Sequence, residues 1–566
     1  MNPSIAKNWW TYPPIPVEIN KKLESYPRFL RQVLYNRGIS GIEQAETYLA
    51  ARDPQHDPFT LKDMESTVQR LLAAIDSHEK IAVYGDYDVD GVTATALMVQ
   101  VLQRFGALVD RHIPNRFEEG YGLNTQSIDR LNEQGVKLIL TVDCGIRSPR
   151  EAEYARELGI DLIVSDHHFP QDVLPNAYAV VCPKQEGDGY PFKELSGVGL
   201  AYKIAQALFG TRKVGDWSAE DWLDLVALGT VSDLVPLVDE NRALVRKGLQ
   251  QIRYGHRMGI NALCGAASKD PARITATDIA FGLGPRLNAA GRMESAEKAY
   301  ELLMTNDRNE AGMIAQELDN QNSNRQYATR KAQEKAEETL SGSELTNLIA
   351  AFDEEFNAGI VGLVASKLTE RYYRPAVVGS VEGDFIKASC RSISEFHITR
   401  ALDECADILL RHGGHSMAAG FTVHRDYKDQ LVERLNQIAN RELDGLDLRP
   451  TLKIDIELTP EEVTSRIYPE LEKLQPTGMG NPAALLALKN VEIREVALIG
   501  SEKTHLRFKV PYAQVYQAVA FNQAQWYNEW LFKHTKFDLA FTIDINSYNG
   551  KETQQIMVKD MRPAAA

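Results

Sequence analysis

Short apolar runs that end in glycine or aspartate recur through the first half of the chain. Three of them, IAVYG (81–85), LILTVD (138–143) and LIVSD (162–166), are rich in β-branched residues, and a segment with helical spacing follows each. Strand and helix alternate in this way over about 61–300. The pattern predicts an open, doubly wound parallel sheet with helices on both faces.

The remaining pattern predicts further domains, as expected for a chain of 566 residues. A charged stretch without proline, at about 296–340, predicts a long connecting helix. A smaller α/β domain should follow, with strands at 348–353, 376–381 and 385–390 and helices at 359–373 and 398–412. The last 120 or so residues alternate short β runs, as in a small barrel. We therefore expect five segments: 1–60 packing on the core, 61–300, 301–345, 346–445 and 446–566.

Acidic and histidine side chains follow the three predicted strands, and Asp233 stands in a fourth apolar run, LVALGTVSDLVPL. In an open α/β sheet the carboxyl ends of the strands meet at one crevice, where ligands bind. Several carboxylates in one crevice repel each other unless cations lie between them. The sequence therefore predicts a metal site. Its expected ligands are Asp86, Asp88, Asp90, Asp143, His167, His168 and Asp233.

The ligand types leave the metal open among manganese, magnesium, iron and zinc. Asp143 is expected to bridge two ions about 3.5–4 Å apart, an arrangement suited to hydrolysing a phosphoester. One ion would use Asp86 or Asp88 with Asp143, and the other Asp90, Asp143, His167 and Asp233. His168 would contact a phosphate oxygen or serve as a ligand. A calcium loop is excluded, because the twelfth position from Asp86 is Leu97 where that loop needs glutamate.

Six motifs in order carry a family resemblance. SDHH, with GDYDVDG, TVDCG, ALGTVSDLVPL and GPRLNAAGRM, resembles the DHH phosphoesterase superfamily, and GGHSMAAGF resembles its DHHA1 partner domain. GMGNPAALL (478–486) resembles the oligonucleotide-binding (OB-fold) domain of the bacterial RecJ family of single-strand-specific exonucleases. In this chain AALLA follows GNP, where the family pattern has a second proline and an aromatic residue.

The resemblance implies 5′-to-3′ hydrolysis of single-stranded DNA to mononucleotides, with two Mn²⁺ or Mg²⁺ ions, in DNA recombination and repair. It implies catalytic roles for Asp143, His168, Arg286 and Asn288. Single-strand binding protein and a RecQ-type helicase are the implied partners, and we expect a monomer. Arginine forks and glycine turns suit phosphate. The expected DNA or phosphate contacts are Arg292, Arg374, Ser389, Arg391, Gly414, His415, Lys503 and Arg507.

Composition modifies this interpretation only slightly. The formal charge of −15 is unusual for a protein that coats nucleic acid, so we expect binding in a local basic channel. Five cysteines without CxxC spacing are typical of reduced thiols in the cytoplasm, and neither a signal peptide nor a membrane span is expected. Two alternatives remain: a hydrolase of oligoribonucleotides or cyclic dinucleotides, and a non-catalytic DHH scaffold.

Overall fold

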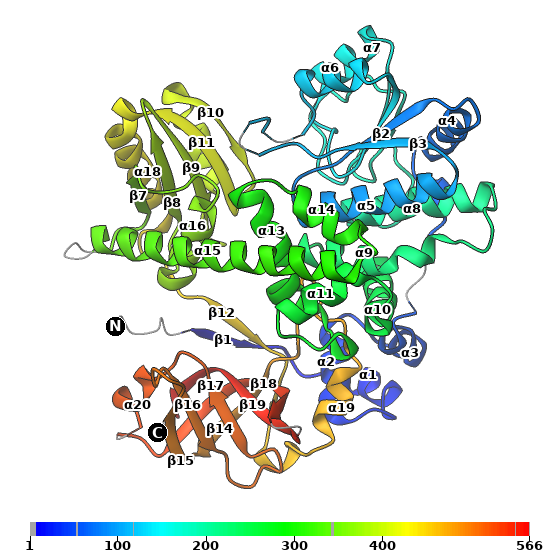
Figure 1. The fold of residues 1–566 in the computed structure, drawn as a ribbon. Helices are drawn as coiled ribbons and strands as arrows, with labels where there is room; N and C mark the ends of the chain where they lie inside the picture. The colour runs from blue at the N-terminus through cyan, green and yellow to red at the C-terminus, as the bar shows by residue number, and fades with distance from the viewer. Residues whose placement is uncertain are drawn as a thin grey trace. The chain divides into compact units, whose positions relative to one another are not determined.

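The computed structural model of the chain describes residues 7–52, 55–116, 118–120, 122–340, 345–531, 533–548 and 551–564 (Figure 1). The chain forms two compact units, each built from separate stretches of sequence. The central unit comprises Thr47–Asn324 and Leu474–Pro482. The terminal unit comprises Met1–Glu46, Arg325–Lys473 and Ala483–Ala566. The predicted division into five segments is finer than these units and stays a prediction.

A five-stranded, fully parallel sheet forms the centre of the central unit. Its strand order is β3-β2-β4-β5-β6. The two strands that follow β2 in the chain, β3 and β4, therefore lie on opposite sides of β2. This reversal is the topological switch point of a doubly wound sheet, where ligands bind. The strands are β2 (Lys80–Tyr84), β3 (Leu108–His112), β4 (Val136–Thr141), β5 (Asp161–Ser165) and β6 (Ala179–Val181).

Alternate residues along each strand enter two different cores. Ile81 and Val83 join the core under helices α4, α5 and α8, whereas Ala82 and Tyr84 join the core under α6 and α7. A strand buried on both faces has no polar face, which explains the uninterrupted apolar runs in the sequence. The prediction of a doubly wound sheet is confirmed. These helices are α4 (Met64–Asp76), α5 (Val89–Arg104), α6 (Thr125–Glu133), α7 (Pro149–Glu157) and α8 (Gly197–Thr211).

Further helices complete the central unit, and most of α9 is buried. Among them a π-helical turn (Ile279–Leu283) leads directly into α13. They are α9 (Leu223–Ser232), α10 (Asp239–Tyr254), α11 (Met258–Ala266), α12 (Ala276–Asp278), α13 (Gly284–Met293) and α14 (Glu297–Met304).

The predicted long helix is interrupted near its start. Helix α14 ends at Met304, and the 33-residue helix α15 (Arg308–Leu340) begins four residues later. Asp307 caps α15, since its carboxylate accepts the N–H groups of Asn309 (2.7 Å) and Glu310 (2.9 Å). The prediction of one continuous helix from about 296 is therefore wrong, because a new helix begins after Asp307. From residue 308 onward the predicted helix is confirmed.

The second α/β domain lies in the terminal unit around a mixed sheet of order β10-β11-β9-β8-β7. The predicted helix over 398–412 is wrong beyond residue 403, because Leu409–Gly414 pairs with β11 as an edge strand. Pairing across the sheet overrides the local helical spacing here. The elements are β7 (Ile349–Asp353), α16 (Val361–Tyr372), β8 (Ala376–Glu382), β9 (Phe385–Arg391), α17 (Ile398–Asp403), β10 (Leu409–Gly414), β11 (Ala418–His424) and α18 (Lys428–Leu443).

The C-terminal part is a seven-stranded mixed sheet of order β13-β14-β18-β19-β17-β16-β15, as expected for a β domain. Near the N-terminus, β1 (Asn8–Thr11) pairs in parallel with β12 (Thr451–Ile454). No described helix combines the length and apolar character that crossing a membrane requires. The remaining elements are α1 (Val17–Lys22), α2 (Arg28–Asn36), α3 (Ile42–Ala50), β13 (Ile456–Leu458), α19 (Ile467–Glu472), β14 (Leu486–Glu492), β15 (Arg494–Ile499), β16 (His505–Lys509), β17 (Gln517–Ala520), α20 (Gln525–Glu529), β18 (Lys536–Tyr548) and β19 (Lys551–Pro563).

Candidate metal centre

The predicted ligands gather at the switch point of the parallel sheet. Asp86 follows β2, Asp143 follows β4, and His167 follows β5, three strands that lie side by side. Asp233 reaches the same place from the C-terminal end of α9. The site therefore brings together residues that are up to 147 positions apart, Asp86 to Asp233. The strand-end argument accounts for Asp86, Asp143 and His167, whereas Asp233 comes from the end of a helix.

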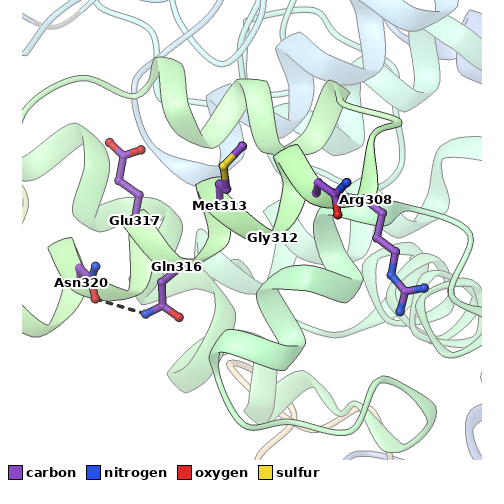
Figure 2. Close-up of a pocket in the computed structure, with 7 residues that line it drawn as sticks. Arg308, Gly312, Met313, Gln316, Glu317 and Asn320 are labelled. Atoms are coloured by element: carbon purple, nitrogen blue, oxygen red, sulfur yellow. Dashed lines mark hydrogen bonds between the residues drawn. The ribbon is translucent and has the colours of Figure 1, made fainter.

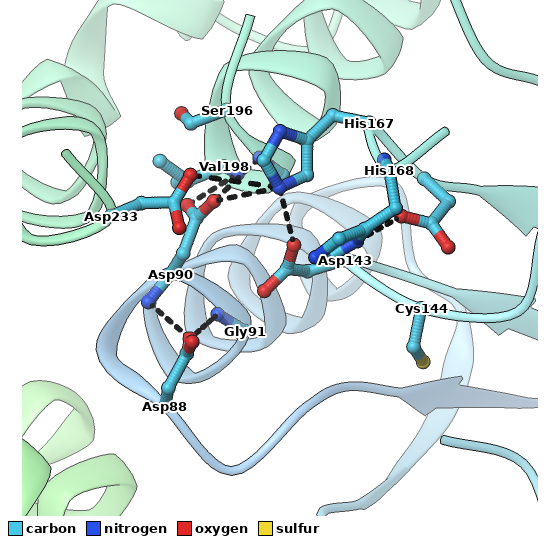
Figure 3. Close-up of polar contacts among 12 residues, drawn as sticks. Asp88, Asp90, Gly91, Asp143, Cys144, His167, His168, Ser196, Val198 and Asp233 are labelled. Carbon is cyan, nitrogen blue, oxygen red and sulfur yellow. Dashed lines mark hydrogen bonds and ion pairs between the residues drawn. The ribbon is translucent and has the colours of Figure 1, made fainter. Parts of the chain in front are cut away.

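The side chains form three overlapping groups whose ligand atoms lie within 4.8 Å of one another. Nε2 of His167 is 3.2 Å from Asp143 Oδ1, 3.5 Å from Asp233 Oδ2 and 3.9 Å from Asp90 Oδ2 (Figure 3). Asp143 and His167 each belong to two groups, so the groups are contiguous. The three groups are Asp143, His167 and His168; Asp90, His167 and Asp233; and Asp86, Asp88 and Asp143.

Helix N-termini hold two of the carboxylates in place. Asp88 caps α5 and accepts the N–H groups of Asp90 (2.9 Å) and Gly91 (3.1 Å). Asp90 lies on the first turn of α5 and accepts the N–H groups of Gly197 (2.6 Å) and Val198 (2.8 Å) at the start of α8. Because backbone N–H groups at a helix start favour negative charge, both carboxylates are oriented by the fold itself.

The backbone at Asp143 is unusual. Its φ is +64°, a conformation that is disfavoured for residues other than glycine, and its N–H donates to the carbonyl of Ser165 at 3.0 Å. Gly197 lies directly against this residue, since a Cβ at Gly197 would be 2.5 Å from the Cβ of Asp143. The close approach of α8 to Asp143 therefore requires glycine at this position.

Asp166 orients His168. One carboxylate oxygen of Asp166 accepts from His168 Nδ1 (2.7 Å) and from its N–H (3.0 Å), and the other accepts the N–H of Ile146 (3.0 Å). Burial disfavours the charged imidazole, but the hydrogen bond and charge of Asp166 outweigh it and raise the pKa of His168. With Nδ1 bonded to a carboxylate, Nε2 is the atom that can face a ligand.

Burial and mutual repulsion disfavour ionisation of the carboxylates. Burial and then the charge of Asp88 raise the pKa of Asp86 well above its usual range and that of Asp90 to about 7. Burial and the charge of Asp90 act in the same way on the pKa values of Asp143 and Asp233. A cluster of this kind holds protons at neutral pH unless cations replace them.

The donor set fits divalent cations. Oδ1 of Asp86 is buried with no hydrogen-bond partner among the described residues, as expected of an oxygen that faces an ion. Burial and the charge of His168 lower the pKa of His167 to about 3, so this imidazole is neutral and able to coordinate. Carboxylate oxygens with one or two imidazoles suit manganese and magnesium.

A cavity of about 180 Å³ opens beside Asp86 and Asp88. Asn288 and Arg292, both expected near the substrate, line it, and Asn288 also accepts the N–H of Val89 at 3.3 Å. The cavity contains a residue that sequence reasoning missed, Arg116, whose guanidinium lies 4.8 Å from the ring centre of Tyr87. The available signal was a basic residue in the loop after β3, which neighbours β2 in the sheet.

Arg286 is engaged elsewhere. Its guanidinium pairs with Asp319 on α15 at 2.8–2.9 Å and donates to the carbonyl of Gly282 at 2.7 Å. The ion pair with Asp319 joins α13 to α15 within the central unit. The cavity beside Asp86 and Asp88 is lined instead by Asn288 and Arg292 of α13. The catalytic role expected for Arg286 stays a prediction.

The terminal unit brings two predicted phosphate contacts together. Ser389 and Arg391 stand on β9, and a Cβ at Gly362 would be 3.2 Å from Arg391 Nη2 and 3.4 Å from Ser389 Oγ. Gly362 is on the first turn of α16, a position whose N–H groups favour anions. Burial lowers the pKa of Arg391, which remains charged.

Other predicted contacts are more dispersed. Gly414 ends β10 with φ +149°, and the N–H of His415 donates to Ala418 at 2.8 Å, within the hairpin that joins β10 and β11. Arg374 donates to the carbonyls of Tyr373 (3.0 Å) and Leu448 (3.5 Å). Arg507 on β16 and Lys503 in the turn between β15 and β16 are both exposed. The DNA contacts expected of these residues stay predictions.

A larger hollow, of about 740 Å³, lies along the first turns of α15 (Figure 2). Its lining includes Arg308, Met313 and Glu317, and Gln316 donates to Asn320 at 3.2 Å. The described lining residues come from one exposed helix face and include no aspartate, histidine or cysteine. The hollow therefore offers no ligand set comparable with that at the sheet edge.

Comparison with known proteins identifies the domains. The DHH family N-terminal domain matches residues 80–230, the DHHA1 domain matches 345–441, and the RecJ OB domain matches 454–560. The first match runs from β2 into α9 and includes six of the seven predicted ligands, while Asp233 lies three residues beyond its end. The last two correspond to the smaller α/β domain and the seven-stranded sheet.

Whole-chain comparisons agree. The single-stranded-DNA-specific exonuclease RecJ of Bacillus subtilis is 40% identical over 93% of this chain and 67% of that protein. Its Escherichia coli counterpart is 34% identical over 95% of this chain and 96% of that protein. The crystal structure of Thermus thermophilus RecJ with Mn²⁺ matches 99% of this chain and 80% of that one, with a TM-score of 0.85 and 29% identity. The chain belongs to the RecJ family of single-stranded-DNA-specific exonucleases.

Proposed function

We propose that this protein is a divalent-cation-dependent exonuclease that degrades single-stranded DNA from the 5′ end to mononucleotides, in DNA recombination and repair. The observation that carries the proposal is the sharing of Asp143 and His167 between neighbouring ligand groups. Shared ligands at the switch point suit two adjacent cations, which when bound polarise the phosphodiester and activate water. Mn²⁺ and Mg²⁺ are the ions this donor set favours.

The ligands divide into two sets around Asp143. Asp86 and Asp88 would hold one ion with Asp143, and Asp90, His167 and Asp233 would hold the other with the same carboxylate. Each set combines acceptors that helix starts or buried strands keep in place. The negative charge of the cluster then attracts the cations and, once neutralised, no longer repels the phosphate.

Other residues would position the substrate. His168, held by Asp166, would donate from Nε2 to a non-bridging phosphate oxygen and stabilise its growing charge. Arg116 and Arg292, which line the cavity beside Asp86 and Asp88, would bind the neighbouring phosphate, with Asn288 orienting the strand. Arg391 and Ser389 would bind a further phosphate in the DHHA1 domain.

The two alternatives have less support. A hydrolase of oligoribonucleotides or cyclic dinucleotides has no need of the OB domain at 454–560, which suits a longer strand. A non-catalytic scaffold has no need to keep seven ligands in contiguous groups. A cytoplasmic location, a monomeric state, and cooperation with single-strand binding protein and a RecQ-type helicase remain parts of the proposal.

End-labelled DNA tests the proposed function. The full chain is incubated with Mn²⁺ or Mg²⁺ and single- or double-stranded DNA labelled at either end. We expect rapid release of 5′-labelled mononucleotides from single strands, loss of this activity in Asp143→Ala, and normal activity in Asp216→Ala, which changes an exposed aspartate outside the ligand groups. Activity confined to oligomers of two to five nucleotides would contradict the proposal, as would mononucleotide release from the 3′ label.

A further inference from the structure

A short segment of the C-terminal sequence packs with the metal-binding unit. Leu474–Pro482, which precedes the OB-domain strand β14, groups with the central unit, whereas the residues on both sides of it group with the terminal unit. We call it the 474–482 loop. It contains the GMGN part of the sequence motif, to which neither the fold nor the proposed chemistry has assigned a role.

Hydrogen bonds tie the loop to the segment between α9 and α10. The N–H of Leu237 donates to the carbonyl of Met479 at 2.7 Å. The fully buried Arg242, on α10, donates to the carbonyls of Leu474 and Gln475, both at 3.2 Å. A buried guanidinium that donates to two carbonyl oxygens of the loop restrains it, because moving the loop would leave this charge without those partners.

Asn481 closes the loop on itself. Its side-chain amide donates to the carbonyls of Leu474 (3.1 Å) and Pro476 (2.8 Å), and its side-chain oxygen accepts from the hydroxyl of Tyr48 at 2.6 Å. Only 1% of Asn481 is exposed. Its three hydrogen bonds give the loop one conformation, which it presents to the segment after α9.

Two glycines allow the loop to touch that segment closely. Gly480 has φ +69°, and a Cβ there would be 2.9 Å from the Cβ of Pro236. A Cβ at Gly478 would be 2.8 Å from Cδ1 of Leu237. The proline ring is rigid, so any side chain at position 480 must displace Pro236 or the loop.

The segment held in this way carries a proposed metal ligand. Asp233 ends α9, and Pro236 and Leu237 follow three and four residues later. Leu234, between them, has φ +64° and is exposed, so local preference and burial of its side chain do not hold this turn. The conformation after Asp233 therefore depends on contacts from outside the segment.

Resting on the proposed function, we infer that the 474–482 loop is a positioning element for the metal centre, which holds Asp233 at the distance from His167 that ion binding needs. Ligand distances tolerate about 0.2 Å, so a small shift of Pro236 and Leu237 is enough to weaken the site. Residues that orient metal ligands commonly change affinity about 10–100-fold.

The test compares Gly480→Ala with Gly445→Ala in the full chain. Both glycines have positive φ, +69° and +77°, but a Cβ at Gly445 meets nothing within 4 Å. Mn²⁺ binding is measured by calorimetry, melting temperature without metal by circular dichroism, and exonuclease rate as a function of Mn²⁺ concentration. Tyr48→Phe, which removes only the hydroxyl bonded to Asn481, is a milder second variant.

We expect Gly480→Ala to weaken one Mn²⁺ site about 10-fold or more, with the rate restored by raised Mn²⁺, and Tyr48→Phe to act in the same direction. Gly445→Ala should match the wild type in Mn²⁺ affinity. Unchanged Mn²⁺ affinity in both loop variants overturns the inference, even where the melting temperature falls, because that result describes a structural role alone. A wild-type chain that binds Mn²⁺ but leaves single-stranded DNA intact contradicts the proposed function instead, and leaves the comparison of Mn²⁺ affinities valid.

Discussion

Replacement of Gly197 by alanine should damage the metal centre through a single methyl group. The new Cβ would lie 2.5 Å from the Cβ of Asp143 and 2.6 Å from its Cγ and Oδ1. Carbon atoms pack at about 3.5 Å or more, so α8 or Asp143 must move by about 1 Å. Rotation of the Asp143 side chain leaves its Cβ in place, and the backbone of Asp143 is held by the hydrogen bond from its N–H to the carbonyl of Ser165.

A movement of about 1 Å is several times the tolerance of a metal–ligand distance, about 0.2 Å. It also disturbs Asp90, which accepts the N–H of Gly197 itself. We expect the exonuclease rate to fall about 100-fold or more, the loss associated with a misplacement of this size. Overpacking should also lower the free energy of unfolding by about 1–3 kcal/mol.

The same helix provides the control. Gly210 is exposed near the C-terminal end of α8, and a Cβ there meets nothing within 4 Å. Gly210→Ala should leave the rate unchanged and stabilise the protein by about 0.5–1 kcal/mol through its helix preference. Rates on 5′-labelled single-stranded DNA, Mn²⁺ calorimetry and thermal melts distinguish the variants. A Gly197→Ala protein with wild-type rate and Mn²⁺ affinity would refute the assigned role of this close contact.

Three further predictions concern charge. Asp166→Asn removes the carboxylate that raises the pKa of His168, so an NMR titration should show a lower pKa and the rate should fall about 10–100-fold; an unchanged pKa would exclude the proposed orientation. Mn²⁺ binding should release protons and strengthen as the pH rises through about 7, because ions displace protons from Asp90 and its neighbours. Calorimetry in buffers of different ionisation enthalpy measures this release, and an affinity independent of pH from 6 to 8 would disprove it. Burial disfavours the charged form of Glu119, but hydrogen bonds from Ser127 and a backbone N–H lower its pKa from 4.5 to about 2. The ionised Glu119 therefore stabilises the folded protein above pH 4.5, and this contribution is lost as the pH falls toward 2. Glu119→Gln should lower the free energy of unfolding by about 2 kcal/mol at pH 7, after allowance for solvent screening, and by less at pH 3; urea unfolding with equal differences at both pH values would contradict this.

The clustering of the expected metal ligands was predictable in large part because the position of several of them depends on a general property of parallel sheets. Short strands that are buried on both faces are recognisable in the sequence as continuous apolar runs, and the residues after them meet at one edge of the sheet. Asp86, Asp143 and His167 needed no further information. The capping aspartate Asp307 was equally visible as a local signal, and overlooking it extended the connecting helix too far toward the N-terminus.

Contacts between residues that are distant in sequence could not be predicted from local patterns. Residues 398–412 have helical spacing, yet the strand that begins at Leu409 pairs with β11, because hydrogen bonds across a sheet outweigh local propensity. Arg286 resembles a substrate contact by motif but pairs with Asp319, a partner 33 residues away. Arg116 enters the cavity beside Asp86 through the packing of a loop whose residues carry no strong motif.

The sequence by itself determined the doubly wound sheet, the candidate ligand set and the family resemblance, since these depend on local periodicity and on the order of motifs along the chain. Only the tertiary structure decided that Asp90 is held by the start of α8, that Gly197 must be glycine, and that the 474–482 loop packs against Pro236 and Leu237. These contacts join residues separated by about 50 to 250 positions. Their distances follow from how whole elements pack, which no local pattern records.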